Sequence, residues 1–185
     1  MARKATVTED MILDSAFALM REEGFEQVTA RKLAAKAGCS TQPIFRMYEN
    51  MEEVVSNVYQ KAITYFEDFY TACPWNEELP FINLGMAYIR FATVEKNMFR
   101  LLFLSEHRGE RSMYELLNGS QGVVSKDAAK AKAAGVRSPG ELFMKMWIFI
   151  HGAACMSLTG DFDLTEEETL TLLVNSYRAY AEVVE

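Results

Sequence analysis

The chain has 185 residues, 50% of them hydrophobic and 12% aromatic, a composition that excludes a disordered protein and supplies a buried core. Its formal net charge of −7 argues against a general nucleic-acid binder. Residues 1–50 contain seven Lys/Arg and seven Asp/Glu, whereas residues 51–185 contain twelve and nineteen, so the acidity belongs to the larger C-terminal part. Any nucleic-acid surface must therefore be a local basic patch on a neutral N-terminal part.

The N-terminal segment MARKATVTED has no hydrophobic signal, and apolar runs such as MWIFIHGAACMSL are broken short of the ~20 residues that a membrane span needs. Three scattered cysteines have no metal-ligand spacing and indicate free thiols in a reducing compartment. We therefore expect a cytoplasmic protein with no membrane partner, no metal and no cofactor. Only four prolines occur and strand-like alternation is short, which predicts an all-α fold.

The first helix is expected from about Thr8 to Glu23, because apolar residues recur there at helical spacing and Gly24 follows as a stop. Residues 29–48 then read as two short helices joined by a turn through Gly38. Thr29 is the expected cap of one and Ser40 of the other. Two helices joined in this way indicate a helix-turn-helix, whose second helix enters the DNA major groove.

Asn50 followed by Glu53 predicts a capped start for a long fourth helix that ends near Ala72. The segment CPWNEELP after it is the expected elbow between two domains. Further helical patterns cover residues 79–95, 97–107, 111–118, 121–134, 138–159 and 165–184. We predict a helix-turn-helix DNA-binding domain over residues 1–54 and a ligand-binding and dimerisation domain over residues 55–185.

Within residues 8–66, a family pattern is formed by Gly24, Phe25, Val28, Thr29, Arg31, Leu33, Ala34, Ala37, Gly38, Ser40, Ile44, Phe45 and Tyr48, followed by the capped start Asn50–Glu53. With this pattern, residues 8–66 resemble the TetR family of bacterial transcriptional regulators. Farther along, Trp147, His151 and Gly152 are similar to a C-terminal ligand-binding subtype of that family. The resemblance covers the N-terminal third of the chain well and the remainder only at this short motif.

The resemblance implies a homodimer whose two recognition helices bind a palindromic operator in double-stranded DNA, with half-sites roughly 34–36 Å apart or a multiple of that. It also implies that a small molecule in the C-terminal domain tilts the fourth helix, and that the protein is a repressor released by this effector. No catalytic motif is present, so the sequence does not predict an enzyme.

On the second helix of the motif, Ile44 and Tyr48 are expected to face inward, which leaves the outward positions to contact DNA. Gln pairs with adenine, Arg with guanine or phosphate, and Phe packs on a thymine methyl. Other polar residues would contact phosphates and set the register. The predicted DNA-binding residues are Arg3, Lys4, Thr29, Arg31, Ser40, Thr41, Gln42, Pro43, Phe45 and Arg46.

The C-terminal helices are rich in Phe, Met and Tyr, which predicts a mainly apolar pocket with a few polar groups. The candidate ligand-binding residues are Tyr88, Phe91, Met98, Phe99, Tyr114, Trp147, His151 and Cys155. Each of them is also a candidate core residue, and His151 is either a ligand contact or a structural histidine.

The last two helices are expected to form the dimer interface as a four-helix bundle across a two-fold axis. The candidate residues are Phe149, Ala153, Met156, Leu172, Leu173, Ser176, Tyr177 and Tyr180, each of which is alternatively part of the core of one subunit.

Two positions depart from the pattern of the family that the segment resembles. Phe45 stands where relatives often have a Tyr that bonds a phosphate, and Glu49 stands where Lys is common. An alternative function therefore remains open, namely a helical small-molecule-binding protein with little or no specific DNA binding.

Overall fold

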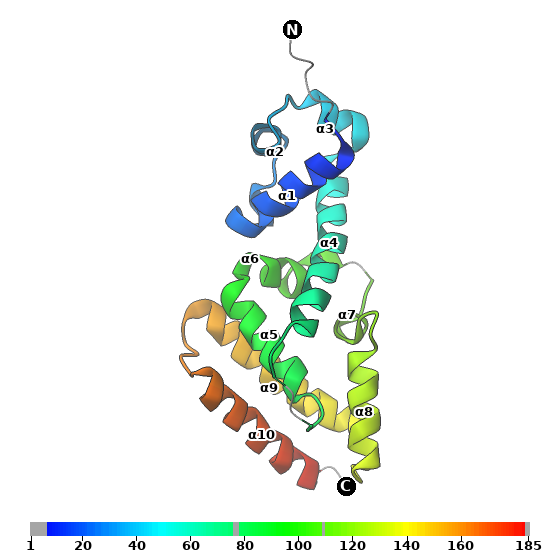
Figure 1. The fold of residues 1–185 in the computed structure, drawn as a ribbon, viewed down its shortest axis with the longest axis vertical. Helices are drawn as coiled ribbons and strands as arrows, with labels where there is room; N and C mark the ends of the chain where they lie inside the picture. The colour runs from blue at the N-terminus through cyan, green and yellow to red at the C-terminus, as the bar shows by residue number, and fades with distance from the viewer. Residues whose placement is uncertain (1–6, 76–77, 109, 184–185) are drawn as a thin grey trace. The chain divides into compact units, whose positions relative to one another are not determined.

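The computed structural model describes residues 7–75, 78–108 and 110–183, and every regular element in these ranges is helical (Figure 1). This confirms the all-α fold expected from the sequence. The chain divides into two compact units. The first unit comprises residues 1–65 and 97–109, and the second comprises residues 66–96 and 110–185.

Along the chain, the first division between the units falls inside helix α4 (Met51–Thr71), after Tyr65. The described residues of the segment 73–80 are non-helical as expected, but both flanks of this segment belong to the second unit. The prediction of an inter-domain elbow there is wrong, because a break in helical periodicity marks a chain reversal, which also joins helices of one unit. The domain boundary expected after residue 54 stays a prediction.

Helix α1 (Glu9–Glu23) confirms the first predicted helix. The Thr8 hydroxyl accepts a hydrogen bond from the Met11 amide at 3.3 Å and so caps the helix. The buried face has the expected spacing, and its residues are Ile12, Ala16, Leu19 and Met20. The short helix η1 (Phe25–Gln27) follows, and then α2 (Ala30–Lys36) and α3 (Gln42–Met47) form the predicted pair of short helices.

The start of α4 also follows its sequence signal. The Asn50 side chain accepts from the Glu53 amide at 2.9 Å, and the Glu53 carboxylate accepts from the Glu49 amide at 2.6 Å. These two bonds satisfy backbone donors that a helix start otherwise leaves without partners.

The predicted helix over 97–107 is divided into α6 (Lys96–Phe99), a π-helical turn η2 (Arg100–Leu104) and a 3-10 turn η3 (Glu106–Arg108). All of this segment except Lys96 belongs to the first unit. The Asn97 side chain donates to the Arg21 carbonyl at 3.0 Å, and the ring of His107 lies edge-on to that of Phe25 at 5.1 Å. The segment therefore packs on the end of α1.

In the second unit, α5 (Ile82–Val94) packs against both α9 (Pro139–Thr159) and α10 (Glu166–Val183), and Figure 1 shows the three helices side by side. Gly85 lies at the contact: a Cβ there would stand 2.8 Å from Ile150 Cδ1 and 3.2 Å from Leu173 Cδ1. Glycine is therefore what permits this close approach.

Helix α7 (Met113–Asn118) packs on α8 (Val123–Ala133), which packs on α9. The last helix begins as expected: the Thr165 hydroxyl accepts from the Glu168 amide at 3.2 Å, and the Glu168 carboxylate accepts from the Thr165 amide at 2.8 Å.

Helix α9 confirms the helix predicted over residues 138–159. Within the described residues, it is the one helix whose length and composition would suffice to cross a membrane. A core helix of a soluble protein passes the same test, and the buried positions of α9 contact α5, α8 and α10.

Tyr48 is an exception to the rule that buried polar groups are paired. The residue is 2% exposed, and its hydroxyl has no hydrogen-bond partner within the described part of the chain. Burial raises the pKa of Tyr48, and the nearby carboxylates of Glu9, Glu53 and Asp10 raise it further. The hydroxyl is thus protonated. Because no hydrogen bond compensates its removal from water, its burial costs about 1–3 kcal/mol of stability.

We expect Tyr48→Phe to raise the free energy of unfolding by about 1 kcal/mol, because it removes the unpaired hydroxyl and keeps the ring. The midpoint of urea unfolding measures this change. The control is Tyr59→Phe, which removes a buried hydroxyl 3.5 Å from the Leu102 carbonyl and is expected to lower stability. A loss of stability in Tyr48→Phe would contradict the assignment of an unpaired hydroxyl.

Candidate nucleic-acid interface and ligand-binding region

The turn between α2 and α3 is defined by backbone hydrogen bonds around Gly38. The Cys39 amide donates to the Ala34 carbonyl at 3.0 Å, and the Gly38 amide donates to the Ala35 carbonyl at 3.3 Å, as in a Schellman motif. Gly38 has φ +66°, a left-handed conformation that costs an L-residue with a side chain roughly 1–2 kcal/mol. The direction in which the chain leaves α2 is therefore set by this residue.

Two buried side chains hold α3 in place, Ile44 within the helix and Tyr48 directly after it. The opposite side of the helix carries residues that are all exposed, as the sequence predicted. These residues are Thr41, Gln42, Phe45 and Arg46. Phe45 is 52% exposed, which is unusual for a large apolar side chain and marks a surface suited to contact with a partner.

The helix begins one residue later than expected. Thr41, and not Ser40, is the cap residue, and no side chain caps the helix there. Thr41 has φ −72° and ψ −17°, which is helical backbone, whereas a hydroxyl reaches the first free amides from an extended cap residue. The predicted Ser40 cap is therefore wrong, although Pro43 does fall in the first turn.

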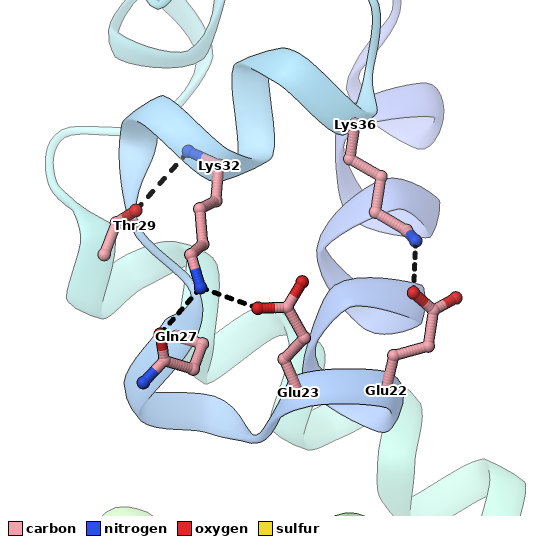
Figure 2. A network of polar contacts seen from close by, with 6 residues as sticks. All are labelled: Glu22, Glu23, Gln27, Thr29, Lys32 and Lys36. Atoms are coloured by element: carbon pink, nitrogen blue, oxygen red, sulfur yellow. Dashed lines mark hydrogen bonds and ion pairs between the residues drawn. The ribbon is translucent and has the colours of Figure 1, made fainter.

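Two lysines of α2 are directed at α1 (Figure 2). Lys32 Nζ lies 2.6 Å from Glu23 Oε2 and 2.7 Å from Gln27 Oε1, and Lys36 Nζ lies 2.7 Å from Glu22 Oε2. Their positive charges are thus largely compensated inside the first unit. These pairs could not be predicted from the sequence, since no fixed spacing relates the end of one helix to the face of the next.

The predicted DNA-binding residues that the structure describes lie on α2, on α3 and in the turn between them. All are exposed except Pro43, which is half-buried. The Thr29 hydroxyl accepts from the Lys32 amide at 3.4 Å, which confirms its capping role. Arg3 and Lys4 lie outside the described residues. That these residues contact DNA stays a prediction.

In the second unit, His151 has protein partners at both ring nitrogens. The Tyr88 hydroxyl lies 2.9 Å from its Nδ1, and Cys155 Sγ lies 3.6 Å from its Nε2. Burial lowers the pKa of His151 and raises the pKa of Tyr88 well above its usual value. A neutral imidazole has one donor and one acceptor nitrogen, and the phenol and the thiol can each donate or accept, so these two partners satisfy both ring nitrogens. This arrangement favours a structural histidine.

The aromatic rings next to His151 form a stack along α9. Trp147 stacks on His151 at 5.3 Å and on Phe143 at 6.4 Å, and Tyr88 meets Trp147 edge-on at 4.8 Å. Rings that pack against one another in this way contribute to the core and leave little space for a ligand. Burial also raises the pKa of the Cys155 thiol, which keeps it protonated.

The other candidate ligand-binding residues are spread over both units. Phe91 is fully buried in the second unit, while Met98 and Phe99 are fully buried in the first. Tyr114 is exposed, and its hydroxyl lies 3.0 Å from Ser125 Oγ. Their role in ligand binding stays a prediction. Within the described residues, no cluster of His, Cys, Asp or Glu is placed to hold a metal ion.

Helix α9 exposes a row of residues spaced four apart. The row consists of Met144, Ile148, Gly152 and Met156, and Ile148 is 67% exposed. Of the candidate dimer residues, only Met156 lies in this row. Phe149, Leu172, Ser176 and Tyr180 are half-buried, and Ala153, Leu173 and Tyr177 are buried in the subunit. The sequence thus missed Met144 and Ile148, which a count of four from Met156 would have found.

Two family models match the chain. The model described as bacterial regulatory proteins, tetR family, matches residues 12–58. The model described as a tetracyclin repressor-like C-terminal domain matches residues 81–181. No curated protein matches the chain at a significant level.

Solved structures with a similar fold include several regulators. A putative transcriptional regulator of the TetR family from Vibrio parahaemolyticus has a TM-score of 0.67 and 18% identity, over 92% of this chain and 97% of its own. A TetR-like transcriptional regulator from Rhodococcus sp. RHA1 has a TM-score of 0.64 and 14% identity, over 95% and 97%. A TetR-family transcriptional regulator from Haemophilus influenzae has a TM-score of 0.60 and 20% identity, over 92% and 94%. At these identities the likeness concerns the fold alone.

The turn at Gly38 provides a test of how the two short helices are held. We expect Gly38→Ala to lower the free energy of unfolding by about 1–2 kcal/mol, because alanine is strained at φ +66°. Urea unfolding measures the loss. The matched control is Gly140→Ala in α9, where a Cβ meets nothing within 4 Å and φ is ordinary. That change is expected to stabilise the protein by about 0.4–1 kcal/mol, and equal effects at both sites would contradict the role of Gly38.

Proposed function

Since the chain belongs to the tetR family of bacterial regulatory proteins, a family of transcriptional regulators and not of enzymes, we propose that it is a ligand-responsive repressor. In this proposal, a cytoplasmic homodimer binds a palindromic operator through its two α3 helices. A small, mainly apolar effector releases it. The family membership establishes a transcriptional regulator, and each of these finer statements is the proposal.

The exposed side of α3 carries the proposal. Gln42 offers the amide that pairs with adenine, and Arg46 offers the fork that pairs with guanine or a phosphate. Phe45 supplies an exposed apolar group that suits a thymine methyl. Because Ile44 and Tyr48 face inward, these side chains are presented together on a short helix that fits a groove about 12 Å wide.

The compensated lysines favour a second candidate, a ligand-binding protein with little specific DNA binding. Lys32 and Lys36 are paired with α1 carboxylates, and Glu49 adds a negative charge directly after the helix-turn-helix. Counterion release scales with the number of phosphates that cations neutralise, so few free cations mean weak non-specific affinity. Under the leading proposal, α3 itself supplies most of the specificity.

We expect Arg46→Ala to weaken operator binding by about 1–3 kcal/mol, because it removes a cation from the exposed side of α3. Fluorescence anisotropy with duplex DNA from the region upstream of the chain's own reading frame, measured over a range of salt concentrations, gives the affinity and its salt slope. A phosphate contact would reduce that slope by about 1.

The matched control is Lys36→Met, which removes a cation that Glu22 already compensates. It is expected to change the operator affinity much less than Arg46→Ala does. Unchanged affinity in Arg46→Ala would remove Arg46 from the interface. Absence of specific binding by the unaltered chain would support the second candidate function.

The exposed row on α9 supports the proposed dimer. A row of large apolar side chains on one helix, with the half-buried residues of α10 described above, is the kind of surface that a second subunit covers. Gly152 lies in the middle of the row, where a Cβ would meet nothing within 4 Å, so another helix can approach closely.

We expect Ile148→Glu to dissociate the dimer at micromolar concentration, because it places a charge in the middle of an apolar interface. Sedimentation velocity measures the change in mass. The control is Leu104→Glu, which alters a 48% exposed leucine of the first unit and is expected to leave the dimer intact. A monomeric unaltered protein would overturn the dimer itself.

A further inference from the structure

A groove in the second unit lies apart from the stack around His151. It has a volume of about 300 Å³, within the range of small-molecule sites. Its apolar lining includes Met86 and Ile89 of α5 together with Phe162 and Leu164, which come between α9 and α10. Trp75, in the segment between α4 and α5, forms an aromatic wall.

The groove contains one cation that is loosely held. Arg90 Nε lies 3.8 Å from Glu166 Oε1, near the limit of an ion pair, and the two side chains are 42% and 63% exposed. Such a pair contributes little, because solvent screens it. The Arg90 guanidinium also lies over the Trp75 ring, 5.5 Å from its centroid. The aromatic ring thus positions a cation whose ion pair with Glu166 is easily exchanged.

Thr169 adds a polar group with no evident structural use. The residue lines the groove and is only 5% exposed. Its hydroxyl makes no hydrogen bond to any residue in the part of the chain that the structure describes. Thr93, also in the lining, differs in this respect because its hydroxyl donates to the Ile89 carbonyl at 3.0 Å. A hydroxyl that lines the groove and has no partner among the described residues can form a hydrogen bond with a bound molecule.

We propose that this groove binds a small aromatic carboxylic acid. The carboxylate takes the place of Glu166 on the Arg90 guanidinium, whose planar fork suits a carboxylate. The ring lies against Trp75 and the apolar lining, and Thr169 supplies a further hydrogen bond to the guest. This proposal gives the chemical class of a ligand. It depends on the second unit alone and not on whether the protein binds DNA.

The test is a calorimetric and fluorescence titration of the full chain with phenylpropanoate, in the absence of DNA. The uncharged analogue phenylpropanamide has the same ring and chain without the charge. We expect saturable binding of the acid, at least tenfold weaker binding of the amide, and a change in tryptophan fluorescence. Trp75→Phe should abolish most of the fluorescence change while calorimetry still detects binding.

Substitutions at Arg90 and Glu166 should act in opposite directions. We expect Arg90→Met to lower the affinity for the acid at least tenfold. Arg90→Lys should lower that affinity less, because lysine keeps the positive charge but lacks the planar fork. Glu166→Gln should tighten binding, because it removes the competing carboxylate, and a gain cannot come from misfolding. Arg137→Met, which makes the same charge change at an exposed position outside the groove, should have no effect.

Equal binding of acid and amide, no saturable binding, or unchanged affinity in Arg90→Met would overturn the proposal. Because DNA is absent from these titrations, such a result leaves the operator measurements unaffected. A failure of operator binding would likewise leave this ligand site standing.

Discussion

The left-handed turn at Gly38 is the constraint on which the first unit depends. Its two backbone hydrogen bonds end α2 and set the direction in which the chain enters α3. A helix of six residues cannot hold its own position, because short isolated helices are unstable in water. Ile44 and Tyr48 bind it to the core, and the turn ensures that these two side chains, and not Phe45 or Arg46, face inward.

The ion pairs between α1 and α2 have a related consequence for charge. They add little stability, since exposed pairs contribute at most about 1 kcal/mol. Their larger effect is to compensate Lys32 and Lys36, which leaves the helix-turn-helix with few cations directed at a partner. Competing non-specific DNA therefore reduces operator binding less, because the affinity of such a regulator for non-specific DNA is small.

Local signals in the sequence predicted most of the fold. Thr29 and Asn50 each cap a helix as expected, and Thr8 and Thr165 do so in the same way, because a cap involves residues only three apart. The Ser40 prediction failed because α3 begins at Gln42, so Thr41 is the cap residue, and its helical backbone does not suit a side-chain cap. The lysine pairs and the groove could not be predicted, since they join side chains that only the tertiary fold brings together, such as Arg90 and Glu166.

The difference between local signals and contacts that only the tertiary fold makes also explains where the second unit has space for a ligand. Aromatic abundance in the sequence suggested a pocket around Trp147 and His151, but these rings contact one another and Tyr88, and burial keeps the histidine neutral. Regular helices with interdigitating side chains fill their shared interior. Space remains where irregular segments, such as the residues around Trp75 and Phe162, meet the end of α5. In this unit, α5 and α10 form most of the lining of that space, and the connections at Trp75 and Phe162 complete it.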